Sequence, residues 1–253
     1  MRSVPLKKVV SHCDKVLKPR EIEDWPGAFN GLQVENRKGV TCIAAAVDAS
    51  LTTVKKAAAL GADMMLVHHG LFWSPKHPWV KRNFELIEAL LNHDMAVYSA
   101  HLPLDIHPKY GNNVLLADAL GLRDWKPFFT DRGRQLGVKA KSRLSFEALA
   151  EKVEDATGSK PVLIPGGKPR AGTVGVVTGG AGAELKIAAS EGVDTFITGE
   201  GPHWTYALAE DLGINVIYGG HYATETFGVR ALAEHLATKF SIRSVFVDHP
   251  TGL

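Results

Sequence analysis

Histidines and carboxylates that can bind metal ions recur in this sequence where apolar segments end. His68 and His69 follow the apolar run 62–67 and precede Gly70. A run of this length predicts a buried strand of a parallel sheet, and the loop after such a strand is the usual position of active sites in open α/β folds. Neutral imidazole is the commonest protein metal ligand, so the pair predicts either a metal site or two loop histidines without chemistry.

Similar polar residues follow the other predicted strands. Cys13 and Cys42 are the only cysteines and lie far apart, so a disulfide framework and a CxxC zinc site are both excluded. Any metal must therefore be held by His, Asp and Glu, a donor set that suits Zn, Mn, Fe or similar divalent ions. The residues at the expected strand ends are His68, His69, His101, Asp105, Glu200, His221 and Glu225.

An internal duplication relates these residues to one another. Residues 43–70 resemble residues 174–201, since each passage has a strand, a helix, a Gly-x-Asp turn and a second strand. Residues 97–101 also match residues 217–221, and in both copies an acid follows the histidine four residues later. Shared α/β physics explains the Gly-x-Asp turns, whereas the repeated Tyr-x-x-His-x-x-x-acid pattern indicates a repeated supersecondary unit. Two such units packed with pseudo-twofold symmetry would bring their strand ends together.

The spacing within the motifs bears on the number of ions. Side chains of successive residues in a strand point to opposite sides, so we expect His68 and His69 to bind two bridged ions rather than one. Glu225 is expected in the first turn of a helix, where the partial positive charge favours a carboxylate beside His221.

Alternating strands and helices of this length predict an α/β sandwich with a mainly parallel sheet. We place a first domain at residues 1–125 and a second at 126–253, with 125–170 as a crossover or small appended layer. Asn112 and Asn113 are expected to cap a helix. The expected helices are 5–18, 51–60, 84–92 and 145–157, and the expected strands include 39–47, 62–69 and 95–100.

Composition limits the remaining classes of function. The chain has 253 residues, is 45% hydrophobic and 22% charged, and has a net charge of +2. These values are ordinary for a globular protein and give no basic patch for nucleic acid. The sequence shows no signal peptide and no apolar run of membrane-spanning length, so we expect a soluble cytoplasmic protein.

Six motifs, taken together, resemble the signatures of the NIF-three-like dinuclear metal-centre family, some of whose members are named GTP cyclohydrolase I type 2. They occur in order over almost the whole chain, at residues 30–34, 68–70, 101–105, 111–113, 199–200 and 220–225. The resemblance implies two intertwined, similar three-layer α/β domains with mainly parallel or mixed sheets. It also implies two divalent metal ions and a toroidal homohexamer, a trimer of dimers. The ligands that it implies are His68, His69, Asp105, His221 and Glu225.

Two further residues are expected to assist the ligands. His101 matches His221 in the duplication but lies outside the implied ligand set, so we expect it to position a ligand or to transfer protons. Glu200 matches His69, and we expect it either to orient water or a ligand or simply to face solvent. His203 and Trp204 can line the same cavity, His107 is expected at the surface, and Asp48 is expected in a turn or cap.

The leading hypothesis is a metal-dependent hydrolase that directs a metal-bridged water at a nucleotide, another small phosphorylated molecule or a peptide-like amide. His101 or Glu200 would move the proton. The sequence lacks a GxxxxGK[ST] loop for a triphosphate, and residues 179–184 form either an anion cradle or a plain turn into a helix. The alternative is a metal-holding regulatory or interaction protein without catalysis, and a nucleic-acid-binding ring is a weaker third hypothesis.

Overall fold

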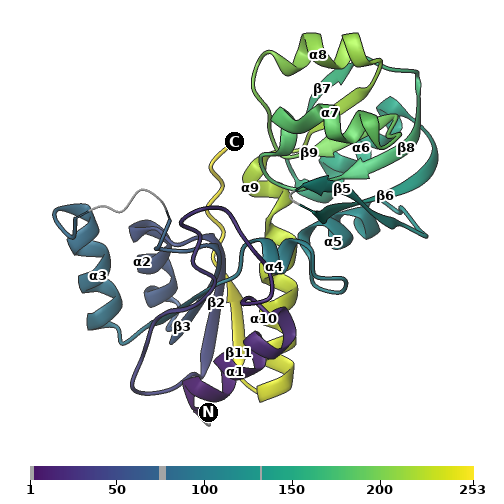
Figure 1. Ribbon diagram of the computed structural model, residues 1–253. Helices are drawn as coiled ribbons and strands as arrows, with labels where there is room; N and C mark the ends of the chain where they lie inside the picture. The colour runs from purple at the N-terminus through teal and green to yellow at the C-terminus, as the bar shows by residue number, and fades with distance from the viewer. Residues whose placement is uncertain (1–2, 74–77, 132) are drawn as a thin grey trace. The chain divides into compact units, whose positions relative to one another are not determined.

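The computed structural model describes residues 3–73, 78–131 and 133–253. The chain forms two compact units, and each is built from separate parts of the sequence (Figure 1). The first unit comprises Met1–Leu104 and Gly228–His249, and the second comprises Asp105–Phe227 and Pro250–Leu253. The chain therefore passes between the units three times, at residues 104–105, 227–228 and 249–250.

The first unit is a three-layer α/β/α domain. Its sheet has the order β1-β4-β3-β2-β11, in which β1 is antiparallel to β4 and the other neighbours are parallel. The strands are β1 (Gly31–Val34), β2 (Cys42–Asp48), β3 (Met64–His69), β4 (Ala96–Ser99) and β11 (Arg243–Phe246). The helices are α1 (Leu6–Leu17), α2 (Leu51–Ala59), α3 (Arg82–Asn92) and most of α10 (Thr226–Phe240).

Strand alternation divides the first unit's core between the two faces of the sheet. Ala44, Met65 and Val97 pack against α2 and α3 in one apolar cluster. On the other face the hydroxyl group of Tyr98 donates to Asp14 of α1 at 2.8 Å. Helices α1 and α10 are joined on that face by a 2.9 Å contact between the Nε2 atoms of His12 and His235.

The second unit has the same three layers around a mixed sheet of order β5-β6-β8-β9-β10-β7, of which β8, β9 and β10 are parallel. Helices α5 (Asn112–Ala119) and α6 (Phe146–Thr157) pack on one face, and α7 (Leu185–Ser190) and α8 (Thr205–Leu212) on the other. The strands are β5 (Lys126–Asp131), β6 (Arg134–Ser145), β7 (Val162–Pro165), β8 (Arg170–Val176), β9 (Thr195–Thr198) and β10 (Asn215–Tyr218). Short helical turns lie at α4 (Leu102–Asp105), η1 (Ala181–Glu184) and α9 (His221–Thr224).

The compact units divide the chain at other points than the expected domains 1–125 and 126–253. Residues 243–246 return to the first unit because β11 pairs with β2, and residues 105–125 belong to the second unit. The segment 125–170 is not an appended layer, because β5, β6 and β7 are strands of the second sheet. The helix expected at 145–157 is confirmed as α6, with Ser145 accepting from the backbone N–H of Ala148.

The duplication is visible in the backbone hydrogen bonds. The N–H of Asp63 donates to Cys42 and that of Asp194 donates to Thr173, at 2.9 and 2.8 Å. Each aspartate also accepts through its side chain from a backbone N–H next to or within the preceding strand, Asp63 from Thr41 N and Asp194 from Thr173 N, both at 2.7 Å. The Gly-x-Asp turns therefore have the same structural role in both copies.

The repeated Tyr-x-x-His pattern is shifted by one residue between the copies. In the first copy, Leu66 lies three residues after Asp63 and pairs with Tyr98. In the second copy, Ile197 lies three residues after Asp194, but it pairs with Ile217 and not with Tyr218. A shift of one residue turns a side chain to the other face of a sheet. Tyr98 accordingly faces α1, whereas the hydroxyl group of Tyr218 lies 2.5 Å from that of Thr205 in α8. The prediction that these tyrosines are equivalent is wrong.

Among the described residues, no helix combines the length and the apolar character that crossing a membrane requires.

We predict that Asp63→Asn lowers the free energy of unfolding by about 1–3 kcal/mol at pH 7. The Asp63 carboxylate is buried, accepts from Thr41 and Cys42, and pairs with Lys38 at 3.0 Å. Burial raises the pKa of Asp63, but the hydrogen bonds from Thr41 and the charge of Lys38 lower it more, so that it lies below 3.8. The stabilisation is therefore complete above pH 3.8 and disappears as the pH falls through the native pKa.

Urea titrations from pH 7 to pH 2.5 measure this effect. The control is Asp118→Asn, which removes a half-exposed carboxylate paired with Arg123. A cost for Asp63→Asn that stays constant down to pH 2.5, or one equal to the control's, would contradict the assignment.

Candidate metal centre

Three histidines gather at the carboxyl ends of β3 and β4 in the first unit. His68 and His69 end β3, and His101 follows β4 by two residues. Because β3 and β4 are parallel neighbours, their ends meet at one edge of the sheet. One ring nitrogen of each histidine lies within 4.8 Å of the others, so the group is able to hold a metal ion.

Strand alternation does not keep His68 and His69 apart. Their ring centroids are 4.8 Å apart, and His101 lies 4.9 Å from His68. His68 is buried and turns to β4, whereas His69 is partly exposed and turns to β2. Since β3 ends at His69, both rings extend past the sheet and approach each other there. The number of ions therefore does not follow from alternation.

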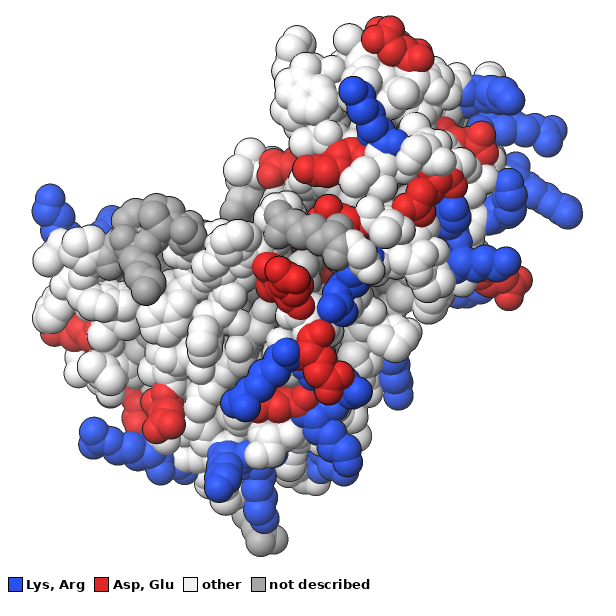
Figure 2. Space-filling model, viewed as in Figure 1, with Lys and Arg blue, Asp and Glu red and all other residues white. Residues whose placement is uncertain are grey.

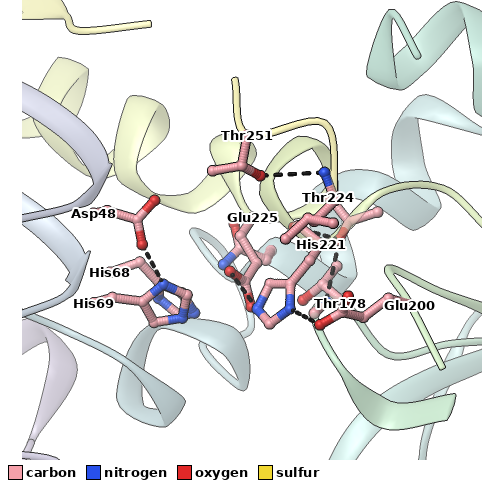
Figure 3. A network of polar contacts seen from close by, with 12 residues as sticks. Asp48, His68, His69, Thr178, Glu200, His221, Thr224, Glu225 and Thr251 are labelled. Carbon is pink, nitrogen blue, oxygen red and sulfur yellow. Dashed lines mark hydrogen bonds and ion pairs between the residues drawn. The ribbon is translucent and has the colours of Figure 1, made fainter. Parts of the chain in front are cut away.

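Each imidazole in this group is held through its Nδ1 atom. His68 Nδ1 lies 2.8 Å from the carbonyl oxygen of Ala100, and His69 Nδ1 lies 2.9 Å from Asp48 Oδ1 (Figure 3). A carbonyl oxygen can only accept, so His68 Nδ1 must carry the hydrogen, and the neutral ring then keeps its lone pair on Nε2. Asp48 was expected in a turn or cap; it lies opposite His69 in the parallel register and orients that ring.

His101 is held by Asp24, a residue that no sequence motif singled out. Asp24 Oδ1 lies 2.7 Å from His101 Nδ1, and the side chain of Asn30 donates to Asp24 Oδ2 at 2.7 Å. The backbone N–H of His101 also donates to Asn30 Oδ1 at 2.7 Å. Burial raises the pKa of Asp24, but the hydrogen bond and charge of His101 lower it more, so the carboxylate is ionised. Residue 30 of the first sequence motif thus has a role in the site.

In the second unit, Asp105 is held by buried polar side chains. It ends the short helix α4. Asn112 Nδ2 donates to Asp105 Oδ1 at 2.8 Å, and Asn113 Nδ2 donates to the backbone oxygen of Asp105 at 3.1 Å. Both asparagines are buried within α5 and do not cap it, because Gly111 occupies the N-cap position. The prediction of an asparagine cap is wrong, and their side chains orient Asp105.

His221 lies between two carboxylates of the second unit (Figure 3). Its Nδ1 atom is 2.8 Å from Glu200 Oε1, and its Nε2 atom is 3.2 Å from Glu225 Oε2. Burial alone lowers the pKa of His221, but the hydrogen bonds and charges of Glu225 and Glu200 raise it to about 9. His221 and Glu225 lie beside each other as expected, but Glu225 lies between α9 and α10 and not in the first turn of a helix. An imidazole and a carboxylate that lie this close together are also suitable metal donors.

Residues 179–184 form a turn into a helix rather than an anion cradle. The N–H of Gly179 donates to Thr224 Oγ1 at 3.1 Å, and its carbonyl oxygen accepts from Thr198 Oγ1 at 2.9 Å. Gly179 has a φ of +74°, which glycine adopts without strain. These backbone groups are used within the protein and hold the segment beside His221.

The remaining candidates are separate from these groups. His107 Nδ1 accepts from the N–H groups of Lys109 and Tyr110, so it stabilises a turn. His203 lines a pocket together with Glu200, whereas Trp204 is exposed and is not among the residues that line it.

Comparisons with known proteins agree with this architecture. A model of the Duf34/NIF3 (NGG1p interacting factor 3) family matches residues 4–251, and the chain belongs to this family. A protein of Pyrococcus abyssi named GTP cyclohydrolase 1 type 2 homolog is 41% identical over 256 residues, which span 98% of this chain and 99% of the relative. A Deinococcus radiodurans protein of the same name is 40% identical over 228 residues, or 89% of this chain and 87% of the relative.

Solved structures show the same fold. TTHA1606 from Thermus thermophilus has a TM-score of 0.91 and 38% identity, covering 99% of this chain and 100% of that one. Reduced HcgD from Methanocaldococcus jannaschii has a TM-score of 0.86 and 26% identity, covering 98% and 100%. The family predicted from the motifs and the mixed α/β fold with two sheets are thus both confirmed.

We predict that the neutral form of metal-free His68 carries its hydrogen on Nδ1, because the oxygen of Ala100 accepts at 2.8 Å. Long-range ¹H–¹⁵N spectra of the imidazoles measure the tautomer directly. Exposed His93 serves as the reference, since neutral histidine in water favours Nε2–H. A hydrogen on Nε2 of His68 would show that the ring is not prepared to bind a cation.

Proposed function

We propose that this protein is a metal-dependent hydrolase of small molecules. The proposed ligands of two divalent ions (Zn, Fe, Mn or similar) are His68 and His69 of the first unit and Asp105, His221 and Glu225 of the second. One observation supports this most strongly: the Nδ1 atoms of His68, His69, His101 and His221 each contact a carbonyl oxygen or a carboxylate. Histidines that bind metal ions almost always have such a partner, which directs Nε2 to the ion.

The donor set fits a divalent ion with oxygen and nitrogen ligands. Imidazole with carboxylate and without thiolate suits Zn, Fe and Mn. Within the second unit, His221 Nε2 and Glu225 Oε2 are 3.2 Å apart, which is close enough for both atoms to bind one ion. Bound divalent ions supply a Lewis acid and lower the pKa of water, which is the chemistry that hydrolysis needs.

The chain's own residues supply orientation and proton transfer. Asp48 fixes the ring of His69, and Glu200 fixes the ring of His221. Asp24 holds His101 with its Nε2 atom directed away from the Asp24 carboxylate, so that His101 is able to accept a proton and return it. The Glu200 side chain is about half exposed, so a substrate reaches the carboxylate that contacts His221.

The names of the relatives point to GTP, and a nucleotide or another small phosphorylated molecule is the class we favour. A nucleic-acid polymer has less support: Figure 2 shows lysines and arginines interspersed with acidic side chains over the face in view. A non-catalytic metal-binding role remains the competing hypothesis.

We predict that His68→Ala and Glu225→Ala each strongly weaken metal binding. Loss of a residue that only orients a metal ligand costs roughly 10- to 100-fold in metal affinity, and loss of the ligand itself should cost more. The measurement is metal content after reconstitution with Zn, Fe or Mn, followed by turnover of a panel of nucleotides, phosphoesters and peptides. His101→Ala should retain the metal and lower turnover about 10²- to 10⁴-fold, as expected for loss of an acid–base group.

The control is His93→Ala, which removes an exposed histidine at the end of α3. Turnover that survives Glu225→Ala would show that hydrolysis does not depend on this metal centre and would contradict the proposal. Metal binding without turnover of any compound in the panel would favour the non-catalytic role. Loss of metal in His101→Ala would make His101 a ligand instead of a proton-transfer group.

We further propose a homohexamer built as a trimer of dimers, on the strength of the family resemblance. Sedimentation equilibrium should then give six times the chain mass of 27.3 kDa, independent of concentration in the micromolar range. The expected mass follows from a closed ring, which has no free interface for further growth. A monomer mass would remove this part of the proposal and leave the ligand assignments in place.

A further inference from the structure

The second unit contains a pocket beside Glu200, the carboxylate that contacts His221. Its volume is about 360 Å³. It lies among the edge strand β7, the loop after β9, the start of α8 and the end of β10. This volume falls at the lower end of the roughly 300–1,000 Å³ typical of small-molecule sites. A ligand of mononucleotide size is therefore favoured over a larger one.

The pocket offers an aromatic and aliphatic surface. Val162, Ile164, Tyr206 and Tyr218 are among the residues that line it. Tyr206 is 46% exposed and Val162 is 61% exposed, so their apolar surfaces are not used in the core. Exposed apolar side chains around a hollow are typical of a binding site. A tyrosine ring of this kind binds the flat face of a heterocycle by stacking.

The pocket lining contains side chains of both charges. Lys160 is the one lysine or arginine among the described lining residues, and His203 adds a second basic side chain. Glu200 is the acid in the lining, and it contacts His221 Nδ1 at 2.8 Å. An anionic group is attracted by Lys160 and repelled by Glu200, so a bound ligand is oriented with its anionic end away from Glu200.

We propose that this pocket binds a nucleoside monophosphate or an equally small heterocyclic anion, stacked on Tyr206 with its anionic group at Lys160. The heterocycle then lies toward Glu200 and the His221 ring that Glu200 orients. This inference rests on the proposed function, because it assigns the substrate class of the same centre. It adds a binding site that lies wholly within the second unit.

Calorimetric titration of the metal-free full-length protein with GMP, AMP, CMP and UMP tests the proposal. At least one monophosphate should bind, and Tyr206→Ala should weaken that binding about tenfold through loss of stacking. Lys160→Ala should weaken the monophosphate about fivefold and leave the matching nucleoside unchanged, since the nucleoside lacks the anionic group. Inorganic phosphate alone should not compete.

Two matched variants are the controls. Trp204→Ala removes an exposed aromatic two residues before Tyr206, and Lys152→Ala removes an exposed lysine of α6; neither residue lines the pocket. Both should bind the monophosphate as the unmodified protein does. The proposal is overturned if no monophosphate binds, or if binding is indifferent to both Tyr206→Ala and Lys160→Ala.

The metal content of the same preparations separates this inference from the proposed function. Nucleotide binding that depends on Tyr206, in a protein that takes up no metal after reconstitution, would refute the metal centre and keep the pocket. Normal metal uptake with no nucleotide binding would refute the pocket and keep the metal centre.

Discussion

The tethering of imidazole Nδ1 atoms is the constraint on which the candidate centre depends. A histidine ring is free to rotate and to exchange its hydrogen between two nitrogens unless one of them is fixed. In this protein a backbone oxygen fixes His68, and the carboxylates of Asp48, Asp24 and Glu200 fix His69, His101 and His221. Each ring therefore presents its Nε2 atom in one direction before any ligand arrives, so ordering the rings costs little further free energy on binding.

The positions of these rings follow from strand topology, and that part could be predicted from the sequence. Apolar runs that end in polar residues identified β3, β4 and β10, and parallel pairing brings the ends of β3 and β4 together. The Gly-x-Asp turns, which shared α/β physics alone could explain, have the same structural role in both copies, because Asp63 and Asp194 each tie a helix-to-strand turn to the preceding strand. The repeated Tyr-x-x-His pattern did not predict equivalent positions. A shift of one residue in the strand register leaves the sequence spacing similar, but it moves the tyrosine side chain to the other face of the sheet.

The sequence indicated Glu200 as a group that orients a ligand, but it did not indicate the other tethers. Asp24 lies 77 residues from His101 in a segment without helix or strand, so no local pattern relates the two. Asn112 and Asn113 have the residue type of helix caps, and only the fold shows that they turn inward to Asp105. Asp48 is the exception, because it ends β2 next to the strand that carries His69. Its position at a strand end, rather than its suitability as a cap, was the informative signal.

Glu200 connects the proposed metal centre to the proposed nucleotide pocket, since it orients His221 and also lines the pocket. A metal site with a purely structural role needs an orienting carboxylate but gains nothing from exposing it, because burial would strengthen the contact. The side chain of Glu200 nevertheless remains 48% exposed at the edge of a hollow lined by aromatic side chains. A small molecule can reach this carboxylate, which is hydrogen-bonded to His221, a proposed metal ligand. Chemistry on a bound substrate explains this arrangement better than a closed structural metal site does.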